Sequence, residues 1–535
     1  QVLDRVDATL RADIDGGLAE IANTALAARE NGVQVQEWSP QAVLETALAE
    51  VQSRSAGWTE SDLIRAINDA LPDYLGITDG ADVAALLDQL AAEALTMVTP
   101  LDAPRPGDEL LPDELRVANG RSAYEAPGAR LYATPDQVQT ERALVSATTA
   151  GGAAALPREV AQRFLAGMAE SGIELGVDQA AAVRGVLTSG ARVETLIGPA
   201  GTGKSFVVGT IARGWTDPST HGGPERRVFG LATSQIATEV LKDEGLTASN
   251  IAAWLGTQRR LSAGGGSVQS QAREADLAWR LHAGDLVVVD ESAMTDTAAL
   301  AAIHFYADTA GAKLLLVGDH RQLAAVGAGG GMDLIAASGA RYELAEARRF
   351  THDWEKDATL QLRAGDETVL GTYHRHGRLL DSGTTDKAEA SAARAWLGDT
   401  LAGQRSLLIV DTNEQAAHVS AEIRAELVRL GRVEEDGVVL GLQGTTAGVG
   451  DLVEARAIAW DLAGYEGNPR GVINRERFHV TAVRPDGGLE VAPLDSASLD
   501  GAGDAATLVL SPDYVAQHLA LGYASTVHAA QGATV

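Results

Sequence analysis

Cysteine is absent from the 535-residue chain, which excludes disulfides, thiolate metal ligands and cysteine nucleophiles. No apolar run reaches the roughly 18 residues that a membrane-spanning helix needs, and the N-terminus carries no signal-peptide pattern. Basic residues are also scarce, because 43 Lys and Arg face 73 Asp and Glu, for a formal net charge of −30. This balance argues against a protein that binds nucleic acid over its whole surface by charge. It is compatible with a narrow channel that contacts phosphates through hydroxyls, backbone N–H groups and a few arginines.

Length and composition indicate a large globular protein. At roughly 100–200 residues per domain, the length predicts about three to five domains. Hydrophobic residues at 45% and charged residues at 22% are ordinary for a folded soluble chain, which argues against disorder over the whole length. The chain begins at Gln1 rather than Met and stops at Val535, directly after a motif-like stretch. We therefore expect an internal fragment of a longer cytoplasmic protein.

The first 175 residues show helical patterns and no recognisable chemistry. Within residues 1–98, apolar residues recur at helical spacing after Ser39-Pro40, after Thr59–Asp62 and from Asp82 onward. Residues 1–98 are therefore predicted to form a packed helical region. Residues 99–175 are predicted to be a linker and an accessory region, with a hairpin over 120–134 and a helix over 135–149.

From Gly176 the pattern changes to strands that alternate with helices, which predicts a parallel sheet and an α/β fold. The strand candidate Val193–Ile197 leads directly into Gly198–Ser205, which fits G-x-x-x-x-G-K-[ST] in full. Glycines in such a loop let backbone N–H groups turn toward phosphate oxygens, and the following helix adds its positive end. Lys204 is positioned to neutralise the β- and γ-phosphates, and Ser205 to ligate Mg²⁺.

Two further strands end in polar residues that suit ATP hydrolysis. Leu286–Val289 is apolar enough for a strand buried on both faces, and Asp290 and Glu291 follow it directly. We interpret Asp290 as a second magnesium partner and Glu291 as the general base for the attacking water. A third strand, Lys313–Val317, precedes Gln322, which is suited to sense the γ-phosphate or the lytic water. In the same loop we interpret His320 as a solvated residue rather than a ligand or base.

Taken in order, these segments resemble the Q motif and motifs I to V of superfamily 1 helicases of the RecD-like branch. The segments are Gly176–Gln179, Gly198–Ser205, Leu231–Gln235, Asp290-Glu291, Gly318–Leu323, Tyr342–Phe350 and Thr526–Gly532. In detail they are similar to the helicase half of conjugative relaxase–helicases of the TraI/TrwC, or MobF, kind. The resemblance covers roughly residues 115 to 535 and is more specific for the helicase class than for the conjugative subfamily.

The resemblance implies an α/β fold with two RecA-like P-loop domains and ATP in the cleft between them. Domain 1 would span 176–345 and domain 2, incomplete, 346–535, with a small β-barrel insertion at about 433–515. Within this insertion, Gly437–Leu440 and Arg477–Val483 are short strand-like runs. Single-stranded DNA would cross both domains, with 5′→3′ polarity. The helical region of residues 1–98 would precede both domains.

The resemblance also implies residue roles. Gln179 would read the adenine, Arg349 would reach the γ-phosphate from the second domain, and Gly532 would sense nucleotide and DNA together. The ATP-binding set is then Gln179, Gly198, Pro199, Ala200, Gly201, Thr202, Gly203, Lys204, Ser205 and Gly532, and the residues near DNA phosphates are Thr233, Ser234, Thr526 and His528.

Two departures from the family pattern matter. The sixth motif, which supplies an arginine to the transition state, would follow Val535, so we expect this fragment to be a weak ATPase. A relaxase needs a catalytic Tyr and three His, whereas His374-Arg375-His376 offers a pair without a third His at suitable spacing. If the parent is a relaxase–helicase, its nicking domain lies upstream of Gln1, and residues 1 to about 115 are the connector.

Three interpretations follow from the sequence. The favoured one is an ATP- and magnesium-dependent DNA helicase motor for plasmid transfer, with single-stranded DNA and the conjugative transfer machinery as partners. The second is a RecD-like recombination and repair helicase without a relaxase. The third, from a different class, is a non-motor P-loop scaffold that binds nucleotide.

Overall fold

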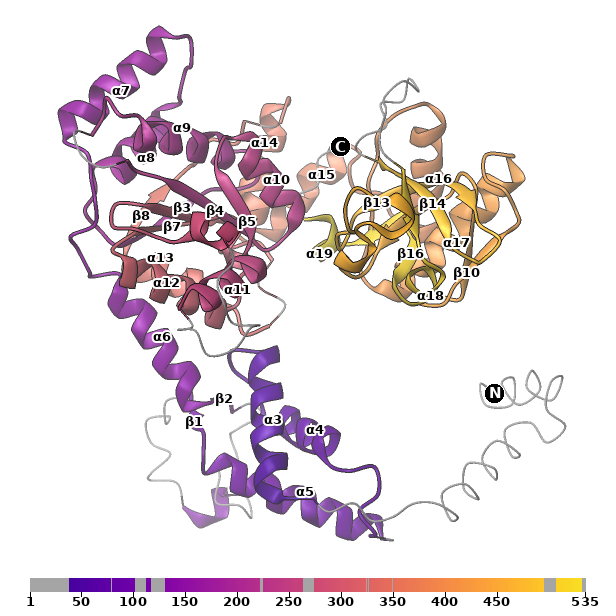
Figure 1. Ribbon diagram of the computed structural model, residues 1–535. Helices are drawn as coiled ribbons and strands as arrows, with labels where there is room; N and C mark the ends of the chain where they lie inside the picture. Colours follow the sequence, from indigo (N-terminus) through magenta and orange to yellow (C-terminus); the bar gives the residue numbers. More distant parts are fainter. Residues whose placement is uncertain are drawn as a thin grey trace, which may run out of the picture.

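A computed structural model describes residues 38–77, 79–101, 112–116, 130–221, 225–262, 274–323, 325, 327–348, 350–494 and 507–531. The described chain forms an N-terminal helical lobe, a central α/β domain and a C-terminal lobe (Figure 1). The predicted hairpin over 120–134 falls mostly outside the described residues, as do Arg349 and Gly532.

The N-terminal lobe packs three helices around one small core. These are α3 (Pro40–Arg54), α4 (Glu60–Ala70) and α5 (Gly80–Leu95). Thr59 caps α4 in a capping box with Asp62, in which the Thr59 N–H donates to Asp62 Oδ2 at 3.0 Å. The helices predicted at these three places are confirmed. A 3₁₀ turn, η2 (Asp113–Leu115), and a two-residue antiparallel pair, β1 (Thr99–Pro100) with β2 (Tyr132–Ala133), follow.

The N-terminal lobe reaches the central domain by two routes. Helix α6 (Pro135–Ala147) starts at the lobe and packs against two helices of the central domain. At its N-cap, Gln52 Oε1 accepts a hydrogen bond from the Thr134 N–H at 2.7 Å. The neighbouring Ser53 carbonyl accepts one from the Ala328 N–H at 3.1 Å. The lobe is therefore tied both to α6 and to the loop that follows the third predicted strand.

The central domain is built on a six-stranded sheet whose described strands all pair in parallel. Its order is β5 (Thr247–Asn250), β4 (Val228–Ala232), β6 (Leu286–Val289), β7 (Lys313–Gly318), β3 (Val193–Ile197) and β8 (Ala340–Glu343). The middle strands are buried along their whole length, as expected for a sheet covered on both faces. Strand β6 is apolar throughout, whereas Glu194 of β3 and Lys313 of β7 form a buried ion pair at 2.7 Å. The strands predicted at Val193, Leu286 and Lys313 are confirmed.

Helices cover both faces of this sheet and form a separate apolar core on each (Figure 1). One core includes residues of α7 (Arg158–Glu170), α8 (Val177–Thr188), α9 (Lys204–Thr216) and α10 (Gln235–Asp243). The other includes residues of α6, α11 (Ile251–Ser262), α12 (Thr297–Ala310) and α13 (Gly331–Ser338). The short turns η3 (Glu274–Trp279) and η4 (Ser292–Met294) precede β6 and follow it.

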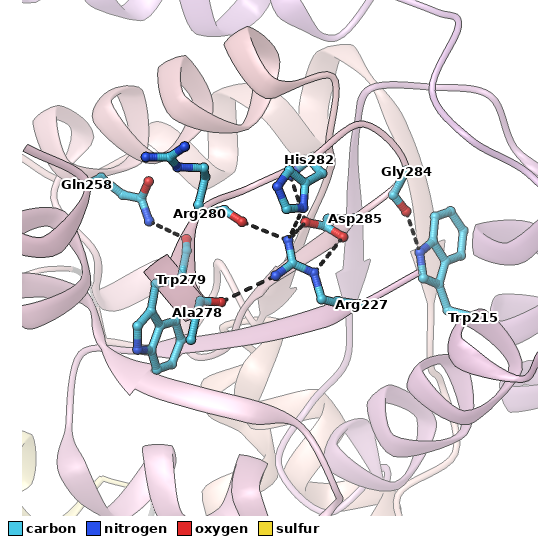
Figure 2. A network of polar contacts seen from close by, with 9 residues as sticks. All are labelled: Trp215, Arg227, Gln258, Ala278, Trp279, Arg280, His282, Gly284 and Asp285. Carbon is cyan, nitrogen blue, oxygen red and sulfur yellow. Dashed lines mark hydrogen bonds and ion pairs between the residues drawn. The ribbon is translucent and has the colours of Figure 1, made fainter. Parts of the chain in front are cut away.

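A polar network fastens the edge of the sheet where β4 and β6 begin (Figure 2). The Arg227 guanidinium donates to the Arg280 carbonyl at 2.7 Å and to Asp285 Oδ2 at 2.6 Å. Beside it, the Trp215 indole N–H donates to the Gly284 carbonyl at 2.9 Å. These bonds attach the segment before β6 to the sheet and leave the opposite strand ends available for a site.

A short helical bridge leads to the C-terminal lobe. It consists of α14 (Asp353–Arg363), η5 (Glu367–Val369) and α15 (Leu370–Arg375), which Figure 1 places between the central domain and the C-terminal lobe. In that lobe α16 (Thr385–Leu401) and α17 (Asn413–Arg429) pack beside a parallel pair, β9 (Leu408–Val410) with β17 (Ala524–Thr526). The last described helix is α19 (Val527–Ala530).

Antiparallel structure is inserted between β9 and β17. A five-stranded sheet has the order β15 (Leu508–Leu510), β14 (Leu489–Pro493), β13 (Arg477–Val483), β12 (Leu452–Ala455) and β16 (Leu519–Leu521). Also inserted are the hairpin β10 (Gly437–Leu440) with β11 (Thr445–Gly448), the turns η6 (Trp460–Leu462) and η7 (Tyr465–Gly467), and α18 (Pro512–His518). The strands predicted at Gly437 and Arg477 are confirmed, whereas closure into a barrel and the domain bounds stay predictions.

Within the ranges that the structure describes, no helix combines the length and the apolar character that crossing a membrane requires.

Candidate nucleotide site

The strand order brings the three predicted loops to one edge of the central sheet. Strand β7 lies between β3 and β6, so the loop with Gln322 emerges between the phosphate loop and Asp290-Glu291. The Gly198 N–H donates to the Gly318 carbonyl at 3.1 Å, which joins the tips of β3 and β7. In open α/β sheets, ligands bind outside the carboxyl ends of the strands. The convergence that the sequence predicts is therefore present.

The loop Gly198–Ser205 has the backbone that its glycines permit. Gly201 and Gly203 both have φ of +81°, a region that side chains other than glycine rarely adopt. The buried Thr202 hydroxyl donates to the Pro199 carbonyl at 2.9 Å, and Lys204 Nζ donates to the Gly198 carbonyl at 3.0 Å. Because α9 begins at Lys204, the positive end of the helix meets the loop. The loop is thus shaped as an anion cradle with one ammonium group at hand.

Gln179 connects this loop to the start of α8 by hydrogen bonds. Its side-chain oxygen accepts from the Gly176 N–H at 3.0 Å, and Nε2 donates to the Thr202 carbonyl at 3.0 Å. The residue is buried, so both ends of the amide are engaged inside the protein. From the sequence, Gln179 has only a predicted adenine contact, which stays a prediction. Gly176 has no side chain to complete a capping box with Gln179, so no local pattern pointed to the contact with Thr202.

The tip of β6 holds two carboxyl groups with different constraints. Asp290 is 5% exposed, and its Oδ1 accepts from the Glu291 N–H at 2.9 Å. Burial and, next to it, the Glu291 carboxylate raise the pKa of Asp290 to about 6, against the opposing effects of the Glu291 N–H hydrogen bond and of Lys204. Glu291 has φ of +46°, an energetically costly conformation for a non-glycine residue that is often found at functional sites. This strain could not be read from the sequence.

The acidic tip of β6 is suited to a divalent cation. A buried carboxylate that resists ionisation gains a compensating charge when such an ion binds. Mg²⁺ prefers oxygen ligands, which Asp290 and the Ser205 hydroxyl provide. These residues therefore fit the metal that the phosphate loop implies.

Beyond β7, Asp319 organises the loop that carries Gln322. Gln322 Nε2 donates to Asp319 Oδ2 at 3.1 Å, and Arg363 of α14 donates to both carboxylate oxygens, through Nε at 2.8 Å and Nη2 at 2.6 Å. Burial alone would raise the pKa of Asp319, but the hydrogen bonds from Arg363, Arg321 and Gln322 hold it below its usual value. Neither Asp319 nor Arg363 has a role that was predicted from the sequence. No local signal could pair two residues that lie 44 positions apart.

The segment after β8 lies against the phosphate loop. The Arg348 N–H donates to the Gly201 carbonyl at 2.8 Å, and Asp178 Oδ2 accepts from the Ala345 N–H at 3.0 Å. Arg349 lies outside the described residues, as does Gly532, so their nucleotide contacts stay predictions. The predicted domain boundary at residue 346 falls within this segment and likewise stays a prediction.

The residues predicted to lie near DNA occur in two separate places. Ser234 caps α10, since its Oγ accepts from the Ala237 N–H at 3.1 Å, and the preceding Thr233 carbonyl accepts from Asn250 Nδ2 at 2.7 Å. In the C-terminal lobe, Thr526 ends β17 and His528 is exposed on α19. Both pairs stand at the carboxyl end of a parallel strand, and their DNA contacts stay predictions.

Neither of the two histidine-containing stretches weighed in the sequence forms a metal site among the described residues. His320 is less solvated than predicted, since its side chain is 21% exposed and its buried Nδ1 has no hydrogen-bond partner, while its Nε2 lies 3.9 Å from Asp333 Oδ1. His376 stacks on Trp354, with ring centroids 3.9 Å apart and planes 4° apart. Across the described positions, no cluster of three or more His, Asp or Glu side chains could hold a metal ion.

The chain is similar in sequence to a protein family and to several known proteins. Residues 174–384 match a family model described as an AAA domain. The chain is 26% identical over 365 residues to "Conjugal transfer protein TraA" of Agrobacterium fabrum, a match that covers 68% of this chain and 30% of that protein. It is 25% identical over 370 residues to the protein of the same name from Rhizobium radiobacter, with the same coverage. A "Probable conjugal transfer protein TraA" of Sinorhizobium fredii is 27% identical over 250 residues, covering 45% of this chain and 20% of that protein.

Among solved structures, the Pif1 helicase of Candida albicans aligns with a TM-score of 0.37 and 17% identity, over 68% of this chain and 88% of that one. The chain spans about 30% of the length of the first two curated relatives. The predicted resemblance to superfamily 1 helicases of the conjugative relaxase–helicase kind is confirmed by the AAA-domain match and the TraA relatives.

Proposed function

We propose that the chain is an ATP-dependent DNA helicase or translocase that acts on single-stranded DNA as the motor of a conjugative transfer protein. One observation carries the proposal: the phosphate loop, Asp290-Glu291 and Gln322 meet at one edge of a parallel sheet, from which a helical bridge leads to a second lobe. The TraA relatives supply the conjugative context. We expect the protein to work in the cytoplasm together with the transfer machinery.

Each residue of the site has a proposed task. Lys204 exchanges its bond to the Gly198 carbonyl for one to the β- and γ-phosphates of ATP. Ser205 and Asp290 hold magnesium, which neutralises phosphate charge when it is bound. Glu291 takes the proton of the attacking water, and Gln322 orients that water or the γ-phosphate. Asp290, whose pKa of about 6 leaves it mostly ionised at neutral pH, would gain from a magnesium ion the compensating charge that its burial otherwise denies it.

The remaining predicted contacts join this proposal. Gln179 and Gly532 would contact the nucleotide, and Arg349 would reach the γ-phosphate. The DNA strand would run from Thr233 and Ser234 to Thr526 and His528, with 5′→3′ movement. Hydroxyl and backbone contacts to phosphate carry no formal charge, which suits a chain whose net charge is −30.

Two substitutions in the full-length protein test the proposal. Lys204→Ala should abolish DNA-stimulated ATP hydrolysis, because the phosphates lose their ammonium partner. Glu291→Gln should keep ATP binding near the wild-type affinity while turnover falls on the order of a hundredfold or more, as expected for loss of a general base. Lys387→Ala, at an exposed lysine of α16, is the matched control and should change neither quantity. Hydrolysis that survives in Lys204→Ala, or binding that is lost in Glu291→Gln, would refute the assignment.

A further inference from the structure

Arg363 of α14 binds Asp319, which lies in the loop that carries Gln322. It makes two hydrogen bonds to the Asp319 carboxylate, Nη2 to Oδ1 at 2.6 Å and Nε to Oδ2 at 2.8 Å. The Asp319 side chain is fully buried, while that of Arg363 is 21% exposed. A bidentate guanidinium–carboxylate pair fixes the relative orientation of its two partners as well as their distance. The pair therefore fixes the end of α14 against the tip of β7.

The same carboxylate also shapes the sensor loop. Asp319 Oδ1 accepts from the Arg321 N–H at 3.2 Å, and Oδ2 accepts from Gln322 Nε2 at 3.1 Å. The Gln322 N–H donates to the Asp319 carbonyl at 3.0 Å. Gln322 is thus held to Asp319 by both its main chain and its side chain. A change in the position of the Asp319 carboxylate would move the amide of Gln322.

Asp319 directly follows Gly318, the residue that is hydrogen-bonded to the phosphate loop. The carbonyl of the preceding Gly318 accepts the bond from the Gly198 N–H, and Pro199 lines the same cavity as Arg321 and Arg363. The pair between Arg363 and Asp319 is therefore part of the wall beside the loop that would hold the γ-phosphate.

On its other side, α14 contacts the rest of the helical bridge, which leads to the C-terminal lobe. Trp354 stacks on His376, and the Thr359 and Tyr373 hydroxyls are 3.2 Å apart. Arg378 Nη2 lies 3.1 Å from Glu355 Oε1. Helix α14 thus shares contacts with α15 and with the segment that enters α16. Motion of this bridge would reach Asp319 through Arg363.

We infer that Arg363 is a positioning residue which holds Gln322 in place through Asp319 and so couples the nucleotide site to the C-terminal lobe. This inference rests on the proposed function and names how the same site is regulated. We assign Arg363 no phosphate contact, because its Nε and Nη2 already donate to the Asp319 carboxylate. Its loss should impair the step that needs Gln322 and spare nucleotide affinity.

The test uses Arg363→Gln, Arg363→Lys and, as a control, Lys356→Gln in the full-length protein. Arg363→Gln should lower the DNA-stimulated kcat on the order of tenfold to a hundredfold, the cost expected when a catalytic group shifts by about 1 Å. KM for ATP and the affinities for ADP and a non-hydrolysable ATP analogue should stay within about threefold of the wild-type values, since the substitution removes no contact to the bound nucleotide. Arg363→Lys keeps the charge but not the fork, so its kcat should be intermediate. Lys356→Gln removes a basic residue of α14 whose contact, Nζ to Asp353 Oδ1 at 3.1 Å, stays within the helix, and it should behave as wild type.

A double variant separates positioning from a structural role. If Arg363 acts through Gln322, then Arg363→Gln should slow Gln322→Ala by no more than about twofold, because residues that act as one unit are not additive. Multiplicative losses would overturn the inference. So would a wild-type kcat in Arg363→Gln, or a selective loss of affinity for the ATP analogue over ADP, which would make Arg363 a direct phosphate ligand.

A readout without turnover keeps this test separate from that of the proposed function. In the nucleotide-free protein, Arg363→Gln should speed hydrogen exchange at the Arg321 and Gln322 amides, which bond to Asp319. Amides of β3 should keep wild-type protection. Unchanged exchange at the two loop amides refutes the positioning role whether or not the protein hydrolyses ATP. A wild-type protein without DNA-stimulated hydrolysis would refute the proposed function. The exchange result would then still decide whether Arg363 positions the loop.

Discussion

Two buried aspartates at neighbouring strand tips should respond to the same substitution with opposite signs. Asp290 ends β6 and is near no described cation except Lys204, and burial raises its pKa to about 6. Asp319 ends β7, and hydrogen bonds led by those from Arg363 hold its pKa below the usual value in spite of burial. We predict that Asp290→Asn stabilises the nucleotide-free central domain at pH 7.5 and that Asp319→Asn destabilises it.

The size of the Asp290 effect follows from linkage. Its pKa rises from 3.8 in the unfolded chain to about 6 in the folded one, so the folded state binds more protons between these values and loses stability as pH rises through 6. At about 1.4 kcal/mol per pKa unit, the ionised carboxylate costs up to ~3 kcal/mol at pH 7.5. Asparagine cannot ionise, so Asp290→Asn should recover much of that amount at pH 7.5 and about half as much at pH 5.

Asp319 has the opposite linkage. Its lowered pKa means that its contribution to stability is present above the unfolded value and is lost as pH falls through the folded value. Removing one partner of a buried ion pair costs about 3–5 kcal/mol, and the partial exposure of Arg363 reduces this to roughly 2 kcal/mol.

Hydrogen exchange of the β6 and β7 amides under increasing denaturant measures both effects. It reports on the central sheet itself, whereas unfolding of a chain with several lobes need not be two-state. The reasoning would be refuted if Asp290→Asn left the exchange free energies unchanged or lowered them at pH 7.5. It would also be refuted if the gain were larger at pH 5 than at pH 7.5.

Two further predictions concern the packing behind the site. Gly185→Ala should lower the free energy of unfolding of the central domain by about 1–3 kcal/mol, because its Cβ would lie 2.1 Å from Tyr342 Cε1, and wild-type exchange free energies at the β3 and β8 amides would contradict this. Lys313→Met should cost about 3–5 kcal/mol, since it leaves the Glu194 carboxylate buried without its charged partner at 2.7 Å. The double variant with Glu194→Gln should recover part of that loss in the same exchange measurement, and a double variant no more stable than Lys313→Met would show that the ion pair is not the cause.

Much of the central domain could be predicted because its signals are local. The strand at Leu286 is a continuous apolar run, and those at Val193 and Lys313 are mostly apolar, as a sheet covered on both faces favours. The parallel arrangement then brings the phosphate loop, Asp290-Glu291 and the Gln322 loop to one edge, since carboxyl ends of parallel strands share an edge. The candidate site followed from the pattern alone.

Other features depend on contacts that no local pattern encodes. The pair of Arg363 with Asp319 joins residues from different elements, and the positive φ of Glu291 is a property of the folded backbone. In the C-terminal lobe the strand at Arg477 was predicted, but the parallel pairing of β9 with β17 across the insertion was not. Pairing order depends on long-range closure, which sequence periodicity does not report.

Calorimetry of ATP with Mg²⁺ measures the proposed nucleotide site itself. We predict saturable binding at one site per chain in the wild-type protein and a loss of affinity of at least about tenfold in Lys204→Ala, because a charge-assisted phosphate contact is worth more than about 1.4 kcal/mol. Lys387→Ala should bind as wild type. No heat of binding in the wild-type protein, or equal affinity in Lys204→Ala, would contradict the nucleotide site on which the proposed motor depends.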